Sequence, residues 1–253
     1  MQFHLRKTVY ILFTAFLFAC TKDEAIWQTQ NLNNNTVSAF GHGGMGIFFK
    51  YPINSYESFE PCMRIGADGT EMDVQLTRDS VLILFHDQKL QDGTLCSGIV
   101  NERNWDEIKN CLHASPYSNS VNMITAAYLL DKLNLDKAII TFDCKLYEAK
   151  NEDRKHFLNA YANALIKLTD KYGIRNKAFI ESNDTTFLRI LKNKDPRMKL
   201  FFYPANFESA LLIANKMDLY GITIANAAIT TEQVKRARAQ PACCGVECRI
   251  GGR

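Results

Sequence analysis

The feature that most constrains the fold of this chain is a regular alternation of short apolar segments with longer helical patterns. The strand candidates, rich in β-branched or aromatic residues, are 37–41, 69–76, 81–85, 138–142, 178–180, 199–203 and 221–225. This alternation is typical of βα units that build a parallel sheet. It predicts an α/β fold, a (β/α)8 TIM barrel that lacks a proper eighth strand, and a doubly wound open sheet is the alternative.

Two helical patterns carry their own end signals. In 154–173, Phe157, Tyr161 and Leu165 fall on one face, and Gly173 is placed to end the helix. In "TTEQVKRARAQ", Thr230 and Gln233 have the spacing of a capping box. The chain has 253 residues, and α/β barrels of about 250 residues fold as single domains. We therefore expect one barrel domain over 37–253.

Polar side chains follow or occupy four consecutive strand candidates. They are His42, Glu71, Asp73, His86, Asp143 and Lys145. Residues two apart on a strand point to the same face, and barrel enzymes carry their chemistry at the carboxyl ends of the strands. Each of these residues alone is more simply explained as a solvated polar group. Their shared location at one rim favours a functional site.

At these residues the chain resembles the glycerophosphodiester phosphodiesterase family. The run "GADGTEMDVQLTRDSVLILFHD" is similar to the family's long motif, and "GHGG" stands where the family usually has His-Arg-Gly. The family fold is a (β/α)8 barrel with two catalytic histidines and one divalent metal ion. The resemblance covers about residues 37 to 240.

The resemblance implies a role for each of these residues. His42 and His86 would be the acid/base pair, Glu71, Asp73 and Asp143 would hold Mg²⁺ or Ca²⁺, and Lys145 would face the phosphate. The residue chemistry agrees, because carboxylate oxygens suit hard cations and imidazoles exchange protons near neutral pH.

The sequence also departs from the family pattern. Gly43 replaces an arginine, so one phosphate contact is missing or is supplied elsewhere. "YPINS" stands where Pro-Glu-Asn-Thr is usual, and Ile53 cannot act as a carboxylate. We expect Asn54 to cap the following helix, with Glu57 three residues later.

The first residues, "MQFHLRKTVYILFTAFLFAC", have the layout of a secretory signal peptide. Their apolar run, 8–19, is too short to span a bilayer of about 30 Å. "LFAC" resembles the lipobox of bacterial lipoproteins, and a plain signal peptide with a chance cysteine is the alternative. We expect a signal peptide over 1–19, a lipidated Cys20 and a polar tether over 20–36. The protein would then be exported and anchored to the bacterial cell envelope, periplasmic or surface-exposed.

Composition restricts the partners. The formal net charge of +3 includes Arg6 and Lys7 of the predicted signal peptide, so the remaining chain is nearly balanced. This argues against a nucleic-acid partner, which would require a clustered basic face. No protein partner is evident, and the expected partners are a small phosphodiester and a membrane reached through the lipid anchor.

The eight cysteines leave disulfide pairing open, although an exported chain can hold disulfides. Cys62 and Cys144 lie in apolar or site-flanking runs and fit small buried side chains. The tail "PACCGVECRIGGR" has three cysteines in six residues and no visible strand pattern. We expect it not to supply the eighth strand, as after a frameshift or truncation.

We therefore expect a metal-dependent hydrolase that converts glycerophosphodiesters to an alcohol and glycerol 3-phosphate. Two alternatives stay open. The Asp143-x-Lys145 pair also resembles the related phospholipases D of spider venom, which act on lipid head-group diesters. The unusual tail also allows a ligand-binding lipoprotein without turnover.

Overall fold

The computed structural model describes residues 38–46, 51–115, 120–136, 138–150, 152–204, 206–240 and 245–249, without the side chains of 247–249. These residues belong to one compact unit, 35–253. The predicted signal peptide, Cys20 and tether lie outside the described residues, as do Cys243 and Cys244. Within the described residues, no helix has both the length and the apolar character needed to cross a membrane.

The unit is built on one sheet. Its strands are β1 (Phe40–His42), β2 (Gly69–Leu76), β3 (Leu82–Leu84), β4 (Ile139–Cys144), β5 (Ala178–Ser182), β6 (Lys199–Phe202), β7 (Gly221–Ala225) and β8 (Gly245–Arg249). The order β1-β2-β4-β5-β6-β7-β8 is parallel throughout, and β3 pairs with β2. The predicted parallel α/β architecture is therefore confirmed.

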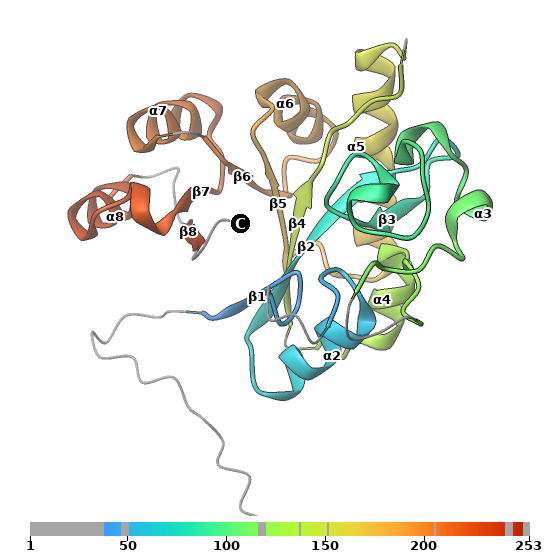
Figure 1. Cartoon of the computed structure of the whole chain (residues 1–253). Helices are drawn as coiled ribbons and strands as arrows, with labels where there is room; N and C mark the ends of the chain where they lie inside the picture. Colours follow the sequence, from blue (N-terminus) through green and yellow to red (C-terminus); the bar gives the residue numbers. More distant parts are fainter. Residues whose placement is uncertain are drawn as a thin grey trace, which may run out of the picture. The chain divides into compact units, whose positions relative to one another are not determined.

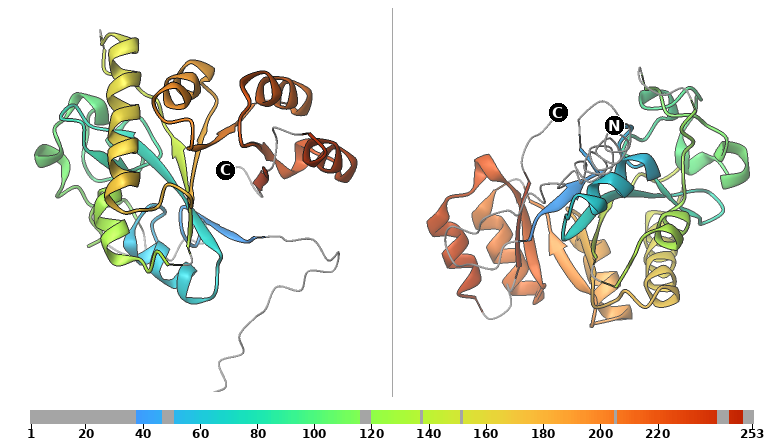
Figure 2. Two further views of the ribbon diagram at one scale, coloured as in Figure 1. Left: turned by 180° about the vertical axis from the view of Figure 1, so that it is seen from behind. Right: turned by 90° about the horizontal axis from the view of Figure 1, so that it is seen from below.

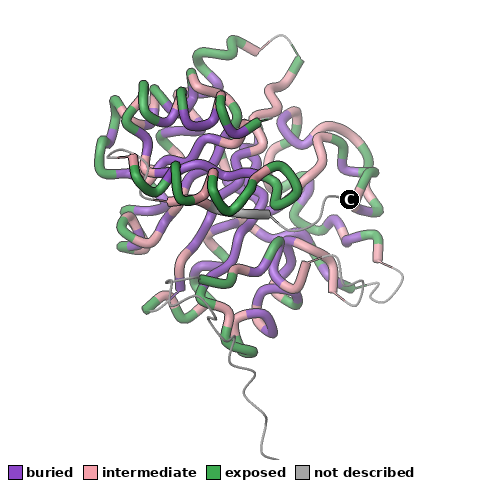
Figure 3. Tube along the Cα trace, turned by 90° about the vertical axis from the view of Figure 1, so that its left-hand side faces the viewer, coloured by how far each residue is buried: buried purple, intermediate pink, exposed green. Residues whose placement is uncertain are grey.

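Most of the helices cover the outer side of this sheet. They are α2 (Tyr56–Arg64), α3 (Trp105–Ile108), α4 (Ala126–Lys132), α5 (Arg154–Lys171), α6 (Thr185–Lys194), α7 (Phe207–Met217) and α8 (Thr231–Arg238), with 3₁₀ turns η1 (Leu90–Asp92), η2 (Val100–Glu102) and η3 (Asn226–Ala228). Figures 1 and 2 show α5 to α8 following the outer side of strands β4 to β8. In Figure 3 the strands are buried and the helices expose one face.

The two predicted helix signals are confirmed. Phe157, Tyr161 and Leu165 are buried on the inner face of α5, and Gly173 follows that helix with a φ of 62°. This left-handed conformation suits glycine, which has no Cβ to clash. The Thr230 side chain accepts a hydrogen bond from the Gln233 N–H in a complete capping box at the start of α8.

The third strand differs from the prediction. Segment 81–85 does not start a new βα unit, because β3 runs antiparallel to β2, with Val74 opposite Leu84 and Leu76 opposite Leu82. The reason is the short connection: five residues, from Thr77 to Val81, separate the two strands. A parallel partner would need a crossover of a dozen or more residues, whereas a hairpin needs a short turn.

The tail also differs from the prediction, because Gly245–Arg249 forms β8 and pairs in parallel with β7 from Gly221 to Ala225. The expectation of no strand rested on the low apolar content of the tail. Val246 packs against the core, and Gly245 makes room for a neighbour, since a Cβ there would lie 2.7 Å from the Phe201 ring. Among the described residues, no pairing joins β8 to β1. The sheet is thus an incomplete (β/α)8 barrel.

Aromatic rings fill the inner side of the sheet near the amino ends of its strands. Phe179 lies 6.4 Å from Phe40, 4.9 Å from Phe201 and 5.7 Å from Tyr220, measured between ring centroids. Gly69 makes room for this layer, since its Cβ would lie 2.7 Å from the Phe40 ring. Residues 71 and 73 follow on the same face of β2. The aromatic layer therefore packs next to the polar site, on the side of the amino ends of the strands.

Candidate active site

Three buried carboxylates meet at the centre of the predicted site. Glu71 and Asp73 lie two apart on β2, and Asp143 is the register partner of Asp73 on β4. One oxygen from each of the three lies within 4.8 Å of the others. Oxygens that share one Mg²⁺ or Ca²⁺ at about 2.0–2.6 Å are at most about 5 Å apart. The donor set and its spacing therefore fit one hard divalent cation.

Lys145 partly neutralises this cluster. Its Nζ lies 3.0 Å from Asp73 Oδ1 and 2.8 Å from Asp143 Oδ2. Burial alone would lower the pKa of Lys145, but the two carboxylates outweigh burial and raise that pKa well above its ordinary value. Three carboxylates still outnumber the lysine by two charges, and buried like charges repel unless a cation balances them.

Asp73 is held ionised by its neighbours. Burial would raise its pKa, but the charges of Lys145 and His86 and a hydrogen bond from Asn54 lower it. The Asn54 Nδ2–H donates to Asp73 Oδ2 at 2.7 Å, and the Asp73 backbone N–H donates to Asn54 Oδ1 at 3.0 Å. Asn54 thus fixes both the backbone and the carboxylate of a candidate ligand.

The predicted helix cap at Asn54 is wrong. The N-cap of α2 is Ser55, which makes no side-chain capping bond. Asn54 has a φ of 63°, a left-handed conformation that asparagine tolerates better than most residues. Its side-chain amide is hydrogen-bonded to Asp73 and is therefore not available to cap the helix.

The hairpin brings His86 to the carboxylates. β1 and β4 pair with opposite edges of β2 at Glu71, while β3 and β4 pair with opposite edges at Val74. β1 and β3 therefore share one edge of β2. β1 ends at His42 opposite Glu71, and the chain leaving β3 passes Asp73, whose carbonyl accepts from the Phe85 N–H at 3.1 Å. The two histidines reach the carboxylates from opposite directions along one strand.

Two contacts orient His86. Its Nδ1 lies 2.9 Å from Asp87 Oδ1, and a carboxylate is an acceptor, so this contact favours the tautomer with a proton on Nδ1. The Gln75 Nε2–H₂ group donates to the carbonyls of Phe85 and Asp87 at 2.7 and 2.8 Å. Gln75 therefore fixes the backbone on both sides of His86. The Nε2 atom of His86 is then available to face a substrate.

His42 occupies a more open position. Its Nε2 lies 4.0 Å from Glu71 Oε2, and its side chain is 46% exposed. The following Gly43 has a φ of 57°, and its N–H donates to Glu71 Oε2 at 3.0 Å. A backbone group thus contacts the cluster at the position where the family usually has arginine. A Cβ on Gly44 would lie 2.5 Å from Ser58 Oγ, so this turn requires glycine.

Glu181 is a further carboxylate beside the site that sequence reasoning missed. It is the register partner of Asp143 on β5 and is fully buried. The predicted strand ended at residue 180, one position before it, whereas β5 continues to Ser182. The available signal was the two-residue spacing of Phe179 and Glu181, which is the same as the spacing of Glu71 and Asp73 on β2.

The cysteines divide into two groups. Cys96 and Cys111 form a disulfide, with Cα atoms 5.7 Å apart. Cys62 and Cys144 are free and buried, as expected. A Cβ on Gly41 would lie 2.3 Å from Cys62 Sγ, so Cys62 packs directly behind the turn that carries His42. Burial raises the pKa of both thiols, which therefore behave as packing groups.

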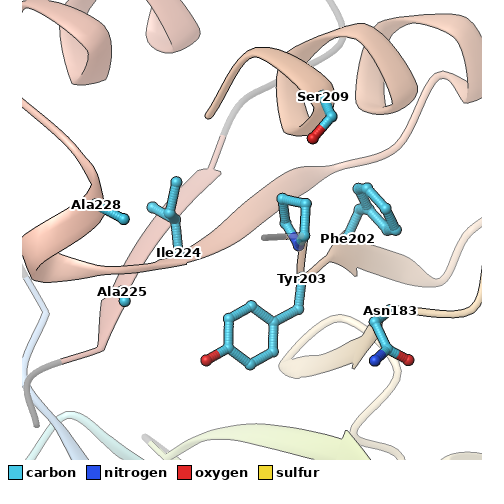
Figure 4. A pocket seen from close by; sticks show the side chains of 8 residues that line it. Asn183, Phe202, Tyr203, Ser209, Ile224, Ala225 and Ala228 are labelled. Atoms are coloured by element: carbon cyan, nitrogen blue, oxygen red, sulfur yellow. The ribbon is translucent and has the colours of Figure 1, made fainter. Parts of the chain in front are cut away.

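Two cavities open near the carboxyl ends of the strands. One of about 270 Å³ is lined in part by Asn54, His86 and Asp87. The other, of about 570 Å³, lies at the ends of β5, β6 and β7, where Asn183, Tyr203 and Ala225 contribute to its wall (Figure 4). Both lie where barrel enzymes bind their substrates.

This combination defines a class of α/β barrel proteins with a carboxylate cluster at the carboxyl ends of the strands, and comparison with known proteins identifies the family. Residues 45–242 match the sequence profile of the Glycerophosphoryl diester phosphodiesterase family. The match spans most of the chain. The chain belongs to this family.

Individual relatives agree. A glycerophosphodiester phosphodiesterase of Caldanaerobacter subterraneus subsp. tengcongensis is 27% identical over 177 residues, which cover 68% of this chain and 69% of that protein. One from Bacillus altitudinis is 36% identical over 98 residues, 38% of each chain. The protein YqiK of Bacillus subtilis is 34% identical over 95 residues, also 38% of each chain. The chain thus matches well under half the length of the two Bacillus relatives.

Solved structures support the fold. The glycerophosphodiester phosphodiesterase of Agrobacterium tumefaciens has a TM-score of 0.70 at 19% identity, covering 86% of this chain and 88% of that one. An Oleispira antarctica phosphodiesterase, solved with its product sn-glycerol-3-phosphate, has a TM-score of 0.71 at 16% identity, covering 86% and 85%.

Proposed function

We propose that this protein is a metal-dependent phosphodiesterase that hydrolyses glycerophosphodiesters to an alcohol and glycerol 3-phosphate. The observation that carries the proposal is the buried cluster of Glu71, Asp73 and Asp143 with Lys145 among them. Family membership and the product bound to the Oleispira antarctica relative support this substrate class.

The chemistry follows from what a phosphodiester requires. A bound divalent cation would supply positive charge toward the phosphoryl oxygens. The Lys145 ammonium would add to that charge from beside Asp73 and Asp143. Glu71, Asp73 and Asp143 would hold the cation, and Asn54 would keep Asp73 in place.

The two imidazoles would move protons. The attacking hydroxyl must lose a proton and the leaving alcohol must gain one. His42 and His86 approach the carboxylates from opposite directions, so each is placed to serve one side of the phosphate. Asp87 would hold the proton on His86 Nδ1 so that Nε2 faces the substrate.

The assay should identify which product carries the phosphate. Purified protein with Mg²⁺ or Ca²⁺ is incubated with glycerophosphocholine and glycerophosphoethanolamine, and glycerol 3-phosphate is followed with a coupled dehydrogenase. We expect turnover that stops on chelation and returns when the cation is restored. Release of choline phosphate in place of glycerol 3-phosphate would contradict the proposed bond cleavage.

For location, we propose an exported lipoprotein with a signal peptide over 1–19, an anchor at Cys20, a tether over 20–36 and the barrel over 37–253. The sequence of the first twenty residues supports this, and the Cys96–Cys111 disulfide suits an oxidising compartment. Cell fractionation tests it: the intact chain should follow the membrane, and Cys20→Ala should not. Equal partition of the two would contradict the anchor.

A further inference from the structure

One helix side chain contacts the backbone of the site from the outer side of the sheet. Tyr161 lies in α5, 87 positions from Val74, and its side chain is fully buried. Its Oη–H donates to the Val74 carbonyl at 2.6 Å. Val74 lies between Asp73 and Gln75 on β2. The bond is therefore formed between a candidate metal ligand and the residue that holds the backbone around His86.

The same carbonyl lies where Lys145 leaves the sheet. β4 ends at Cys144, the register partner of Val74, and the Lys145 backbone N–H donates to the Val74 carbonyl at 2.9 Å. From this point the Lys145 side chain reaches two carboxylates of the cluster, with its Nζ 3.0 and 2.8 Å from their oxygens. The Val74 oxygen thus accepts from both Lys145 and Tyr161, which its two lone pairs allow.

The Tyr161 hydroxyl is a fixed donor. Its ring packs edge-on against Phe157 and Phe187, with ring centroids 5.8 and 5.3 Å away. Burial is the largest of several causes that raise the pKa of Tyr161 well above its ordinary value, so the hydroxyl keeps its proton near neutral pH. A packed ring and a permanent proton therefore hold this donor against the strand.

The Val74 carbonyl does not need this hydroxyl to be satisfied. Without it, the oxygen would still accept from the Lys145 N–H, so no buried backbone group would lose its last partner. The hydroxyl adds restraint, because a second donor limits how far the Val74 peptide, and the Lys145 backbone bonded to it, can move. Restraint matters at a reacting centre, where a displacement of about 1 Å can cost on the order of 10²-fold in rate.

We propose that Tyr161 is a positioning residue, which holds the Lys145 ammonium in place for the phosphate through the Val74 carbonyl. The proposal rests on the proposed function, in which Lys145 adds positive charge toward the phosphoryl oxygens. α5 follows the outer side of the sheet (Figure 1). Tyr161 therefore acts through the backbone of Lys145 and not on the substrate itself.

The first experiment compares two tyrosines of the same helix. Tyr161→Phe removes the hydroxyl at Val74. The matched control, Tyr172→Phe at the end of α5, removes a hydroxyl that lies 2.9 Å from the carbonyl oxygen of Ala127 in α4, a helix without a candidate site residue. Each change should lower the Tm by about 2–4 °C, the effect of one hydrogen bond in a chain of this size. Only Tyr161→Phe should lower kcat on glycerophosphodiesters, by about tenfold. Equal kcat in the two variants would overturn the proposal.

A double-mutant cycle separates positioning from a general loss of stability. Lys145→Gln removes the ammonium through which Tyr161 is proposed to act. In that background, Tyr161→Phe should lower the Tm as before but lower the remaining kcat by less than about twofold, because the effects of coupled residues do not add. A tenfold loss that persists without the lysine would contradict the proposal, since Tyr161 would then act by a route that does not include Lys145.

Amide hydrogen exchange, followed by NMR, tests the same bond without turnover. In Tyr161→Phe, the Lys145 amide should exchange about fivefold faster relative to the Ile140 amide of β4, which donates to the Lys177 carbonyl at 2.8 Å. Tyr172→Phe should leave this ratio unchanged. If no diester is turned over, the proposed function fails, and the exchange ratio still decides whether Tyr161 restrains Lys145. A ratio that is the same in the two variants and the unmodified protein would overturn that restraint.

Discussion

The two halves of the sheet carry different kinds of residue on their inner faces. The first half, residues 38–150 with β1 to β4, places histidines, carboxylates and a lysine on or beside the inner face of its strands. The second half, residues 152–249 with β5 to β8, carries much of the aromatic layer, with Phe179, Phe201 and Tyr220 packed together. Polar contacts such as Asn54 to Asp73 are characteristic of the first half, and packing between aromatic rings is characteristic of the second.

This difference indicates which kind of substitution disrupts each half. A site built from charged groups fails when one partner is removed, because the remaining buried charges lose their balance. A packed wall fails when its volume changes. Changes in the first half should therefore act on activity, and changes in the second half should act mainly on stability.

The largest effect is expected from the carboxylate cluster. Glu71→Gln removes one candidate ligand from the three that lie within 4.8 Å. We expect loss of detectable turnover and of cation binding in calorimetry, because the site loses both a ligand and a charge. Turnover that survives both this change and exhaustive chelation would refute the metal site.

The histidines should give the next largest effect. We expect His42→Ala and His86→Ala each to lower kcat by roughly 10²- to 10⁴-fold, the usual value of general acid–base catalysis. Cation affinity should stay close to that of the unmodified protein, which separates this loss from that of Glu71→Gln. Near-normal turnover in either variant would remove that histidine from the mechanism.

The tail tests the second half. Deleting residues 241–253 removes β8, leaves β7 as an edge strand and uncovers the side of Phe201 that faces Gly245. We expect the free energy of unfolding to fall by about 2–4 kcal/mol, from lost burial and an exposed edge. Cation affinity should change little, because the candidate ligands Glu71, Asp73 and Asp143 all lie in the first half. An unchanged denaturation midpoint would show that the tail does not contribute to the fold.

A smaller loss is expected at Asn54. Asn54→Gly keeps the left-handed backbone, with its φ of 63°, but removes both side-chain bonds to Asp73. Outer partners of metal ligands typically contribute 10- to 100-fold to metal affinity or activity, and we expect a loss in that range. If cation affinity and kcat both stay normal, Asn54 does not position Asp73.

The smallest expected effect is a pH-dependent change in the free energy of unfolding, caused by Asp184 in the second half. Asp184 caps α6; burial would raise its pKa, but the Phe187 and Thr186 N–H groups and Arg154 lower it. A lowered folded-state pKa stabilises the fold above the unfolded value, near 3.9, and this contribution is lost as pH falls through the folded value. Asp184→Asn should cost about 0.5 kcal/mol at pH 7, and this cost should disappear as pH falls through the folded-state pKa. A cost that stays the same across an acid titration would contradict a charge effect.

Prediction from the sequence succeeded where local pattern and structure agree. Segment 69–76 was predicted with its observed bounds, because Met72, Val74 and Leu76 alternate with polar residues at the two-residue period of a strand. The α5 helix and the α8 capping box follow equally local rules. The shared rim of Glu71, Asp73 and Asp143 also follows from strand periodicity and parallel order.

The misses have physical reasons. The direction of β3 depends on the length of its connection to β2, which the strand pattern alone does not express. β8 was missed because it has few apolar residues; the space beside Gly245 is filled by Phe201 of β6, which is not its pairing partner. The role of Asn54 was missed because its side-chain amide hydrogen-bonds to Asp73, 19 positions away, and does not cap the adjacent helix.

The shared edge of β2 has a consequence for how the family can diversify. Because β1 and β3 end at neighbouring points of one strand, the register of the hairpin sets the interval between His42 and His86. Moving β3 by one residue along β2 would turn its side chains to the other face, and moving it by two would displace His86 by about 7 Å. Insertions within the turn 77–81 should therefore be strongly selected against. The segment between His86 and α4 lies outside the hairpin, so its length and sequence can change without moving either histidine along β2.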